Sequence, residues 1–499
     1  MSTIIETVEE KVQDYLSSTR KMLINNEWVP SISGKVYESI NPANGEAHAK
    51  IYEGDKEDVD RAVQAARAAF KSWSKTSPAL RTSLLNKLAD LIEQRGDELA
   101  YLESLDLGCT RSFAQNAFVP GAAAHLRYYA GWATKLTGDT MALTSGANVH
   151  AYTKREAIGV CGQITSWNFP LLGATWKLAA PLAAGCTVVL KPSQQTTLTT
   201  LLLGELIQEA GFPPGVVNIV AGSGGKIGEA ISNHPDIDKI GFTGSTVVGK
   251  GIMRNASTNL KKITLELGGK SPNIIFADAD LEKAIEGVIT GASFYNQGQV
   301  CAAGTRVYVE SSVYDDVIEK LTAIVKSMKV GNPLDSETVM GPLVSKQQLD
   351  TVLGYIESAK SDGATILAGG NQPDDADLSN GYYIEPTLIT GLDENCKAVN
   401  EEIFGPVLAI LPFDSTEEVI ERANLTEYGL VAGVWTKDIS KAHKMIDALE
   451  SGTVWINGYM LNDDNIPLGG YKQSGVGQEM AYEGIKSYTK VKSVVINLD

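Results

Sequence analysis

From about Glu156 onward, short apolar runs rich in β-branched residues alternate with helical stretches, and this alternation limits the fold more than any other feature of the chain. The first series of runs is AIGVCGQIT, TVVLKP, VVNIV and KIGFTG, with helical patterns over 197–210 and from Ser245. The second series is ITLEL, NIIF and RVYVES, with helices expected over 280–295 and 313–328. Because strands that alternate with helices form a parallel sheet covered by helices, the two series predict an α/β protein of two lobes with a cleft between them.

The segment before the first series is expected to be helical. Between Glu57 and Gly108, apolar residues recur at spacings of three and four, and the glycine suits a helix C-terminus. The polar stretch NQPDDADLSNGYY, over 371–383, predicts a surface loop.

The charge balance argues against two classes of partner. The 499 residues include 60 acidic against 43 basic side chains, a formal net charge of -17, which would repel nucleic acid and offers no polybasic patch to a membrane. The opening MSTIIETVEEKVQDYL has acidic residues where a signal peptide needs a basic region. The uncharged stretch over 178–190 is shorter than the ~20 residues of a membrane-spanning helix. We therefore expect a cytoplasmic protein that binds neither nucleic acid nor membrane.

The cysteines point to free thiols in a reducing compartment. Their number is odd and they form no CxxC pair, which disfavours a disulfide framework and a zinc site, so no metal is expected. They are Cys109, Cys161, Cys186, Cys301 and Cys396.

Cys301 lies in the stretch NQGQVCAAG, over 296–304, among glycines, alanines and side-chain amides. Taken alone it would be a packing thiol, because cysteine is among the most buried residue types. The helix expected over 280–295 ends just before it, small neighbours leave it uncrowded, and backbone N–H groups there could face an anion. A reactive thiol is therefore the second interpretation.

A reactive thiol needs partners, and two residues are candidates. Glu266 in LELGGK is a carboxylate inside an apolar strand, which suits a general base, although an edge-strand glutamate facing water is the simpler interpretation. Asn168 in TSWNFP is an amide between aromatic residues and before a proline, where an ordinary turn residue would also fit.

Two further segments suggest a nucleotide site. In GFTGSTVVGK a strand runs through Gly244 and Ser245 into a helix whose N-terminus could hold a pyrophosphate, although the spacing is not GxGxxG. Lys191 in VVLKP ends a predicted parallel strand, where α/β folds bind ligands, although such a lysine is usually solvated.

Seven segments in order resemble the NAD(P)-dependent aldehyde dehydrogenase superfamily, and most closely its bacterial phenylacetaldehyde and general aldehyde dehydrogenases. They span nearly the whole chain: TSWNFP, KPSQQT, FTGSTVVG, LELGGK, NQGQVCAAG, EEIFGPV over 401–407 and PLGGYKQSG over 467–475.

The resemblance implies a role for each matching residue. Cys301 is the nucleophile, and Glu266 activates the water that hydrolyses the acyl-enzyme. Asn168 and the Cys301 backbone N–H stabilise the oxyanion, and Lys177 supports the asparagine and the nicotinamide region. The residues implied to hold NAD, and by extension NADP, are Trp167, Lys191, Gln194, Gly244, Ser245, Glu402 and Phe404. The substrate would contact Phe169, Trp176, Tyr295 and Leu468.

Oxidation of an aldehyde requires each of the groups in this set of residues. An aldehyde carbon has no good leaving group, so a thiolate must first make it tetrahedral before hydride is lost. The oxyanion then needs preorganised donors, and hydrolysis of the resulting thioester needs a carboxylate base with a raised pKa.

The resemblance also implies an arrangement of domains. A Rossmann-like dinucleotide-binding domain is expected over 1–133 and 157–265, and a catalytic domain over 266–474. A small β ribbon over 134–156 and 475–499 would join subunits, because a β-rich tail such as YTKVKSVVINLD leaves an unpaired edge in a monomer. A homodimer or homotetramer is therefore expected.

Three alternatives remain at this point. A CoA-acylating dehydrogenase is one, although Glu266 argues against it. A cysteine hydrolase would need a histidine beside the thiol, and none of the five histidines lies in a matching motif. A non-catalytic protein of the same fold is the third.

The sequence says less about specificity. Leu468 replaces an aromatic residue found in many relatives, and MLNDDN over 460–465 lacks the rings of a quaternary-ammonium cage, which disfavours betaine aldehyde. Medium aliphatic or arylalkyl aldehydes such as phenylacetaldehyde fit better. Gln194 stands where NAD-preferring relatives have a glutamate, so we expect NADP to be used as well, unless loop shape sets the selectivity.

Overall fold

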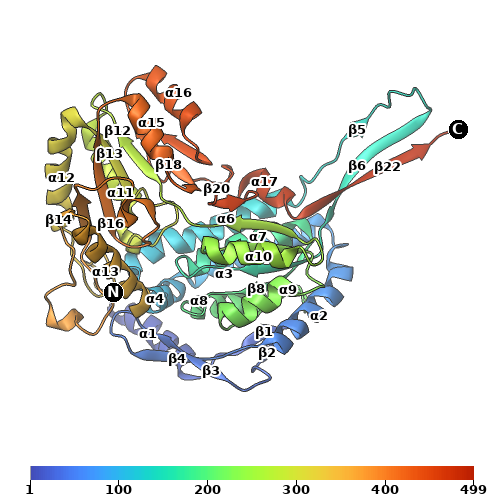
Figure 1. Ribbon diagram of the computed structural model, residues 1–499. Coiled ribbons are helices and arrows are strands. Elements are labelled where there is room, and N and C mark those ends of the chain that lie inside the picture. The colour runs from blue at the N-terminus through green and yellow to red at the C-terminus, as the bar shows by residue number, and fades with distance from the viewer. Residues whose placement is uncertain (1) are drawn as a thin grey trace.

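The structure is a computed structural model that describes residues 2–499, with side chains from residue 8 onward. Two open sheets form two lobes, and a third sheet stands off the body as a ribbon (Figure 1). This α/β architecture confirms the fold class predicted from the alternation of strands and helices. None of the helices in residues 2–499 is long and apolar enough to cross a membrane.

The first lobe is built on an eight-stranded sheet in the order β2-β1-β9-β8-β7-β10-β11-β21. Its five central strands are parallel, and an antiparallel strand flanks them on each side. The bounds are β1 Met22–Ile24, β2 Glu27–Val29, β7 Val160–Ile164, β8 Thr187–Lys191, β9 Val217–Ile219, β10 Lys239–Thr243, β11 Lys262–Glu266 and β21 Gly475–Val476.

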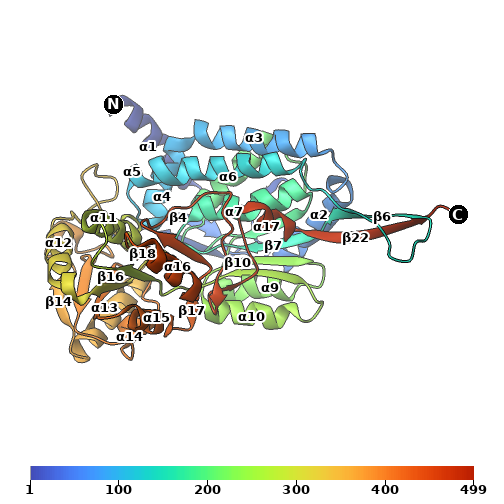
Figure 2. The same ribbon diagram turned by 90° about the horizontal axis from the view of Figure 1, so that it is seen from above.

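Helices cover both faces of this sheet (Figure 2). On one face α7 (Pro170–Ala184) and α8 (Leu198–Ala210) are covered in turn by α3 (Pro78–Gln94), α4 (Gly96–Leu107) and α6 (Val119–Trp132). On the other lie α2 (Lys56–Trp73), α9 (Glu229–Asn233) and α10 (Thr246–Ala256). The predicted helix ends are confirmed at Gly108 and Gly211, which adopt left-handed backbone conformations that favour glycine.

The second lobe is built on a seven-stranded sheet in the order β14-β15-β16-β13-β12-β18-β19. All neighbours are parallel except β14 and β15. The strands are β12 Pro272–Ile275, β13 Arg306–Glu310, β14 Thr365–Ala368, β15 Thr387–Thr390, β16 Val407–Phe413, β18 Val431–Trp435 and β19 Thr453–Ile456. The helices are α11 Leu281–Ala292, α12 Tyr314–Lys326, α13 Lys346–Ser361, α15 Thr416–Asn424 and α16 Ile439–Ala448.

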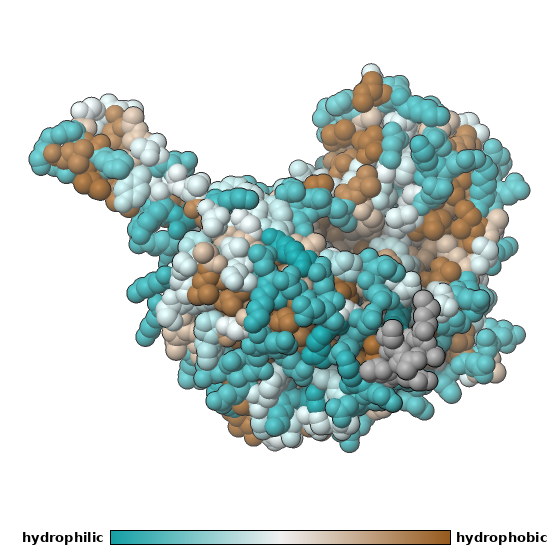
Figure 3. Space-filling model, turned by 180° about the vertical axis from the view of Figure 1, so that it is seen from behind, coloured by the Kyte–Doolittle hydropathy of each residue, from teal (hydrophilic) through white to brown (hydrophobic). Residues whose placement is uncertain are grey.

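The ribbon consists of β5 (Thr140–Met141), β6 (Val149–Ala157) and β22 (Thr489–Asn497). β22 pairs antiparallel with β6 along its full length and extends away from both lobes (Figures 1 and 3). Val491, Val495 and Ile496 are exposed on it. The expected β-rich tail is therefore present, and its part in subunit contacts stays a prediction.

Two boundaries differ from expectation. The helix expected over 280–295 ends at Ala292, because Ser293 turns the backbone into the left-handed region, and a short 3-10 turn follows. Residues 475–486, which we expected in the ribbon segment, lie on the first lobe, where β21 pairs with β11 and α17 (Ala481–Lys486) packs on α7 and α6.

Candidate active site

The candidate site lies where the carboxyl ends of central strands of the first sheet face a loop of the second lobe. The register aligns Thr243 at the end of β10 with Glu266 at the end of β11, and the segment leading to Asn168 follows β7. Across the cleft, the loop between α11 and β13 presents Cys301. Parallel strands thus collect these side chains at one edge of the sheet.

A tight turn places the Cys301 loop. Gln297 and Gly298 both adopt left-handed conformations, with φ of 54° and 67°. A Cβ on Gly298 would lie 2.2 Å from the Gly405 carbonyl oxygen, so the close approach of these two segments requires glycine at position 298. The thiol therefore sits in a turn held against the second lobe, and not at a helix end as we expected.

The surroundings of the Cys301 thiol disfavour its ionised form. Its burial in the cleft, together with the Glu402 and Glu266 carboxyls, raises its pKa to about 12, although the backbone N–H groups of Cys301 and Ala302 act in the opposite direction. A nucleophilic role therefore requires deprotonation once substrate and cofactor have changed this environment.

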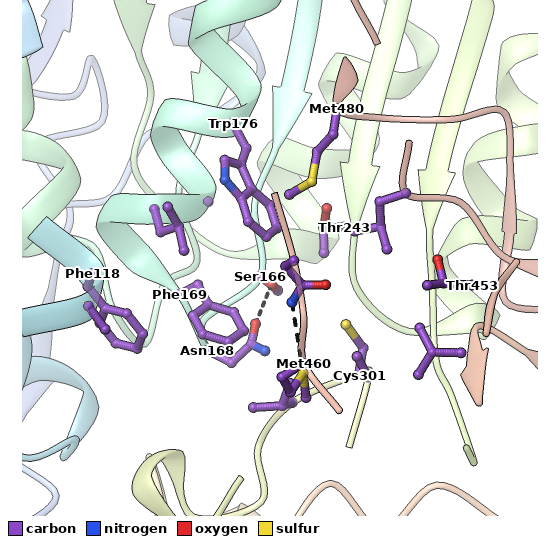
Figure 4. Close-up of a pocket in the computed structure, with 18 of the residues that line it drawn as sticks. Phe118, Ser166, Asn168, Phe169, Trp176, Thr243, Cys301, Thr453, Met460 and Met480 are labelled. Atoms are coloured by element: carbon purple, nitrogen blue, oxygen red, sulfur yellow. Dashed lines mark hydrogen bonds between the residues drawn. The ribbon is translucent and has the colours of Figure 1, made fainter. Parts of the chain in front are cut away.

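Asn168 is buried and fixed from three sides. Its backbone oxygen accepts a hydrogen bond from Asn296 Nδ2 at 2.9 Å, and its Nδ2 donates to the Gln299 carbonyl oxygen at 2.8 Å. Its Oδ1 accepts from the Ser166 hydroxyl at 2.7 Å. Asn168 and Cys301 face the same pocket in Figure 4. One amide N–H thus stays free to bind an oxyanion.

Glu266 is not an edge-strand glutamate, because β11 lies between β10 and β21 and the residue is 5% exposed. That simpler interpretation is wrong. Burial and the neighbouring Glu479 hold the pKa of Glu266 well above its usual range, although Lys177 acts to lower it. Its Oε1 atom has no hydrogen-bond partner within residues 2–499. Once ionised, a carboxylate with a raised pKa is a stronger base and can take a proton from water.

Lys177 forms a buried ion pair with Glu479, whose carboxylate comes from the segment before α17. Among the described residues no hydrogen bond joins Lys177 to Asn168, and the support of the asparagine and the nicotinamide region that the resemblance implied stays a prediction. Sequence motifs gave no signal for Glu479, which is distant along the chain. The ion pair instead neighbours Glu266 and influences its pKa.

An apolar cavity of about 280 Å³ opens beside the thiol. All four residues expected to contact the substrate, Phe169, Trp176, Tyr295 and Leu468, line it. Its wall also includes residues that no motif pointed to, among them Phe113, Phe118, Leu172, Trp455, Met460 and Met480.

Aromatic rings that contact one another in turn line one side of this cavity. Phe113 stacks on Tyr295 with a centroid distance of 4.0 Å and meets Phe118 edge to face at 5.0 Å. Phe118 in turn contacts Phe169 at 5.3 Å. These rings come from outside 460–465, and the expectation that betaine aldehyde is disfavoured stays a prediction.

A second cavity, of about 220 Å³, opens on the other side of Cys301. Five of the residues expected to bind the cofactor line it: Trp167, Gly244, Ser245, Glu402 and Phe404. The Phe404 and Trp167 rings meet edge to face at 5.0 Å, and Glu402 accepts a hydrogen bond from the Gly269 N–H at 2.9 Å. Burial raises the pKa of Glu402 to about 7.

This cavity suits a dinucleotide. A Cβ on Gly268 would lie 2.5 Å from Glu402 Oε2, so the bare backbone there makes room beside the carboxylate. The N-terminus of α10 opens nearby, with Ser245 as its cap and a hydrogen bond from the Val248 N–H to the Ser245 hydroxyl at 3.4 Å. Free N–H groups of a helix N-terminus bind phosphate.

Lys191 and Gln194 lie beyond both cavities, at the end of β8. The expectation of a solvated lysine is wrong, because Lys191 is 4% exposed and its Nζ donates to the Pro192 carbonyl oxygen at 3.0 Å. Burial lowers its pKa to about 8. Contacts of these two side chains with a cofactor stay predictions.

A thiol that lines both an apolar cavity and a second cavity beside the N-terminus of α10, at the junction of two Rossmann-like lobes, defines a class of α/β proteins to which known families can be compared. Residues 28–494 match the aldehyde dehydrogenase family, and the chain belongs to this family. This confirms the family resemblance.

Known relatives agree with this assignment along the whole chain. The human mitochondrial aldehyde dehydrogenase is 48% identical over 96% of this chain and 92% of its own length. Human retinaldehyde dehydrogenase 3 is 49% identical over 96% and 93%. The structure of the aldehyde dehydrogenase from Bacillus cereus in complex with NAD+ is 49% identical, with a TM-score of 0.95 over 98% of this chain and 99% of that one.

Proposed function

We propose that this protein oxidises an aldehyde to the carboxylic acid with NAD, and that Cys301 carries the acyl group between oxidation and hydrolysis. The observation that carries the proposal is the position of Cys301 and Asn168, which line the apolar cavity and the second cavity at once. A substrate bound in the first cavity would reach the thiol from one side while a cofactor in the second reaches it from the other. The NAD+ complex of the Bacillus cereus relative supports the choice of cofactor.

Cys301 and Asn168 act in the first half of the proposed reaction. The Cys301 thiolate attacks the carbonyl carbon, and the free Asn168 N–H and the Cys301 backbone N–H bind the oxyanion of the thiohemiacetal. Trp167, Gly244, Ser245, Glu402 and Phe404 would hold NAD, which when bound supplies the hydride acceptor. Loss of hydride leaves the acyl group on Cys301 as a thioester.

Glu266 acts in the second half of the proposed reaction, the hydrolysis of the thioester. Its ionised carboxylate takes a proton from a water molecule, and the resulting hydroxide attacks the thioester carbon. The C–S bond breaks, the carboxylic acid leaves, and the thiol is restored. The raised pKa of the buried Glu266 matches it to this task, since a carboxylate of ordinary pKa is too weak a base.

The size and lining of the first cavity favour medium aliphatic and arylalkyl aldehydes, with phenylacetaldehyde as the representative. Its rings offer edge and face contacts to an aromatic substrate, and Met460 and Met480 add adaptable apolar surface to the wall. Use of NADP beside NAD is part of the proposal, because Gln194 lacks the negative charge that would repel a 2′-phosphate. Assembly through the ribbon into a homodimer or homotetramer is part of it too.

The test is a panel of aldehydes with NAD and NADP in parallel, with absorbance at the NADH wavelength as the readout. Wild-type protein should form NADH, and Cys301→Ala should form none while binding NAD with near-normal affinity, since the thiol is needed for the bond to the carbonyl carbon and the other residues of the second cavity are unchanged. Substantial turnover in Cys301→Ala would refute the proposed mechanism.

A further inference from the structure

The orientation of the Asn168 amide is fixed by a residue that the sequence motifs do not single out. Ser166 lies two residues before Asn168 and lines both cavities. Its hydroxyl donates to Asn168 Oδ1 at 2.7 Å, and Figure 4 shows this bond beside the Cys301 thiol. We propose that Ser166 is a positioning residue, which aims the free N–H of Asn168 at the oxyanion; this inference rests on the proposed function.

The backbone around Ser166 is held so that its hydroxyl has a defined place. The Thr165 N–H donates to the Lys191 carbonyl oxygen at 3.1 Å, and the Trp167 carbonyl oxygen accepts from the Thr196 hydroxyl at 3.1 Å. The Asn168 carbonyl oxygen accepts from Asn296, as described above. With the chain fixed at three points, the remaining freedom is the rotation of the Asn168 side chain.

Two contacts restrict that rotation. The Gln299 carbonyl oxygen accepts one N–H of the amide at 2.8 Å, and a flipped amide would bring two oxygens together there. Gln299 therefore sets which end of the amide is nitrogen. The hydrogen bond to Gln299 alone would still allow the amide to rotate about that contact. The hydrogen bond from Ser166 to Oδ1 prevents this rotation. Together they leave the other N–H in one direction.

Restricting the amide to one orientation favours catalysis, because a preorganised donor stabilises the oxyanion with no cost of reorientation during the reaction. Without the Ser166 hydroxyl, Asn168 would keep its bond to Gln299 but would sample orientations that miss the oxyanion. The loss corresponds to one partly buried neutral hydrogen bond, which predicts a decrease in kcat of about five- to tenfold. Contacts of the thiol itself are unaffected.

The test is a double-mutant cycle on Ser166 and Asn168. Ser166→Ala should lower kcat about five- to tenfold, and it should change the KM for NAD much less than kcat. In an Asn168→Ala background, Ser166→Ala should change kcat less than about twofold, because the residue acts through the amide. Ser166→Thr, which keeps a hydroxyl, should retain more activity than the isosteric Ser166→Val.

A matched control is Ser104→Ala in α4. Ser104 is buried and its hydroxyl donates to the Ala100 carbonyl oxygen at 3.0 Å within its own helix, so the same substitution there should leave kcat unchanged. An equal effect of Ser166→Ala with and without Asn168, or no effect on kcat at all, would overturn the inference. Failure of the wild-type protein to form NADH would instead overturn the proposed function.

Discussion

Replacing Glu266 by glutamine separates the two halves of the proposed reaction. The substitution keeps the size of the side chain and removes its ability to take a proton from water. Thiolate attack and hydride loss do not need this base, so the first turnover should proceed at nearly the wild-type rate. Hydrolysis of the thioester needs it, so the steady state should fall.

The structure supports a large decrease, because Glu479 and Glu402, the carboxylates that influence the pKa of Glu266 and of Cys301, each already have a partner. Glu479 is engaged with Lys177 in a buried ion pair. Glu402, in the second cavity, is held by the Gly269 N–H at 2.9 Å. General base catalysis typically contributes about 100- to 10,000-fold, and because both of these carboxylates are engaged we expect a loss of about 1,000-fold, or about 4 kcal/mol.

Rapid mixing with NAD and a good aldehyde is the assay. Glu266→Gln should show a burst of NADH close to one equivalent per active site, followed by a slow steady state. The matched control Glu417→Gln changes an exposed glutamate of α15 that pairs with Lys444, and it should behave as wild type. If the burst itself disappears in Glu266→Gln, the carboxylate acts before hydride loss and the reasoning is refuted.

The same substitution predicts a change in pH dependence. A base works only when ionised, so wild-type hydrolysis should accelerate as pH rises through the pKa of Glu266, which burial holds well above its usual range. The glutamine variant has no such group and should lose this rise. A pH-rate profile of the steady state measures the difference.

The remaining predictions concern the cofactor and the assembly. Burial raises the pKa of Glu402 to about 7, and its carboxyl accepts hydrogen bonds more strongly when ionised. NAD should therefore bind more weakly as pH falls from 8 to 6, and Glu402→Gln should flatten this dependence in titrations of NAD binding; a flat wild-type curve would contradict the role. Gln194→Glu should lower kcat/KM with NADP at least about tenfold and change kcat/KM with NAD much less, because the new carboxylate would repel the 2′-phosphate of NADP. Equal decreases with both cofactors would refute a role of Gln194 in cofactor selectivity. Light scattering at micromolar concentration should give a multiple of 53.3 kDa, and removal of 489–499 should reduce it; a monomer mass for the intact chain would contradict ribbon assembly.

Much of this architecture could be predicted from local sequence patterns. The alternation of apolar runs and helices gives two α/β series, because strand and helix periodicities depend on residues near one another in the chain. Gly108 and Gly211 stop their helices for an equally local reason, since both positions need a left-handed backbone. The motifs around Cys301, Glu266 and Asn168 were also sufficient to indicate the family.

Tertiary structure decided the contacts between segments that are distant in the chain. Lys177 pairs with Glu479 across 302 positions, and Phe113 stacks on Tyr295 to build the cavity wall. The burial of Glu266 depends on β21, which returns to β11 from the far end of the sequence. No local pattern encodes these contacts, because burial and long-range hydrogen bonds arise only when distant segments of the chain pack together and exclude water.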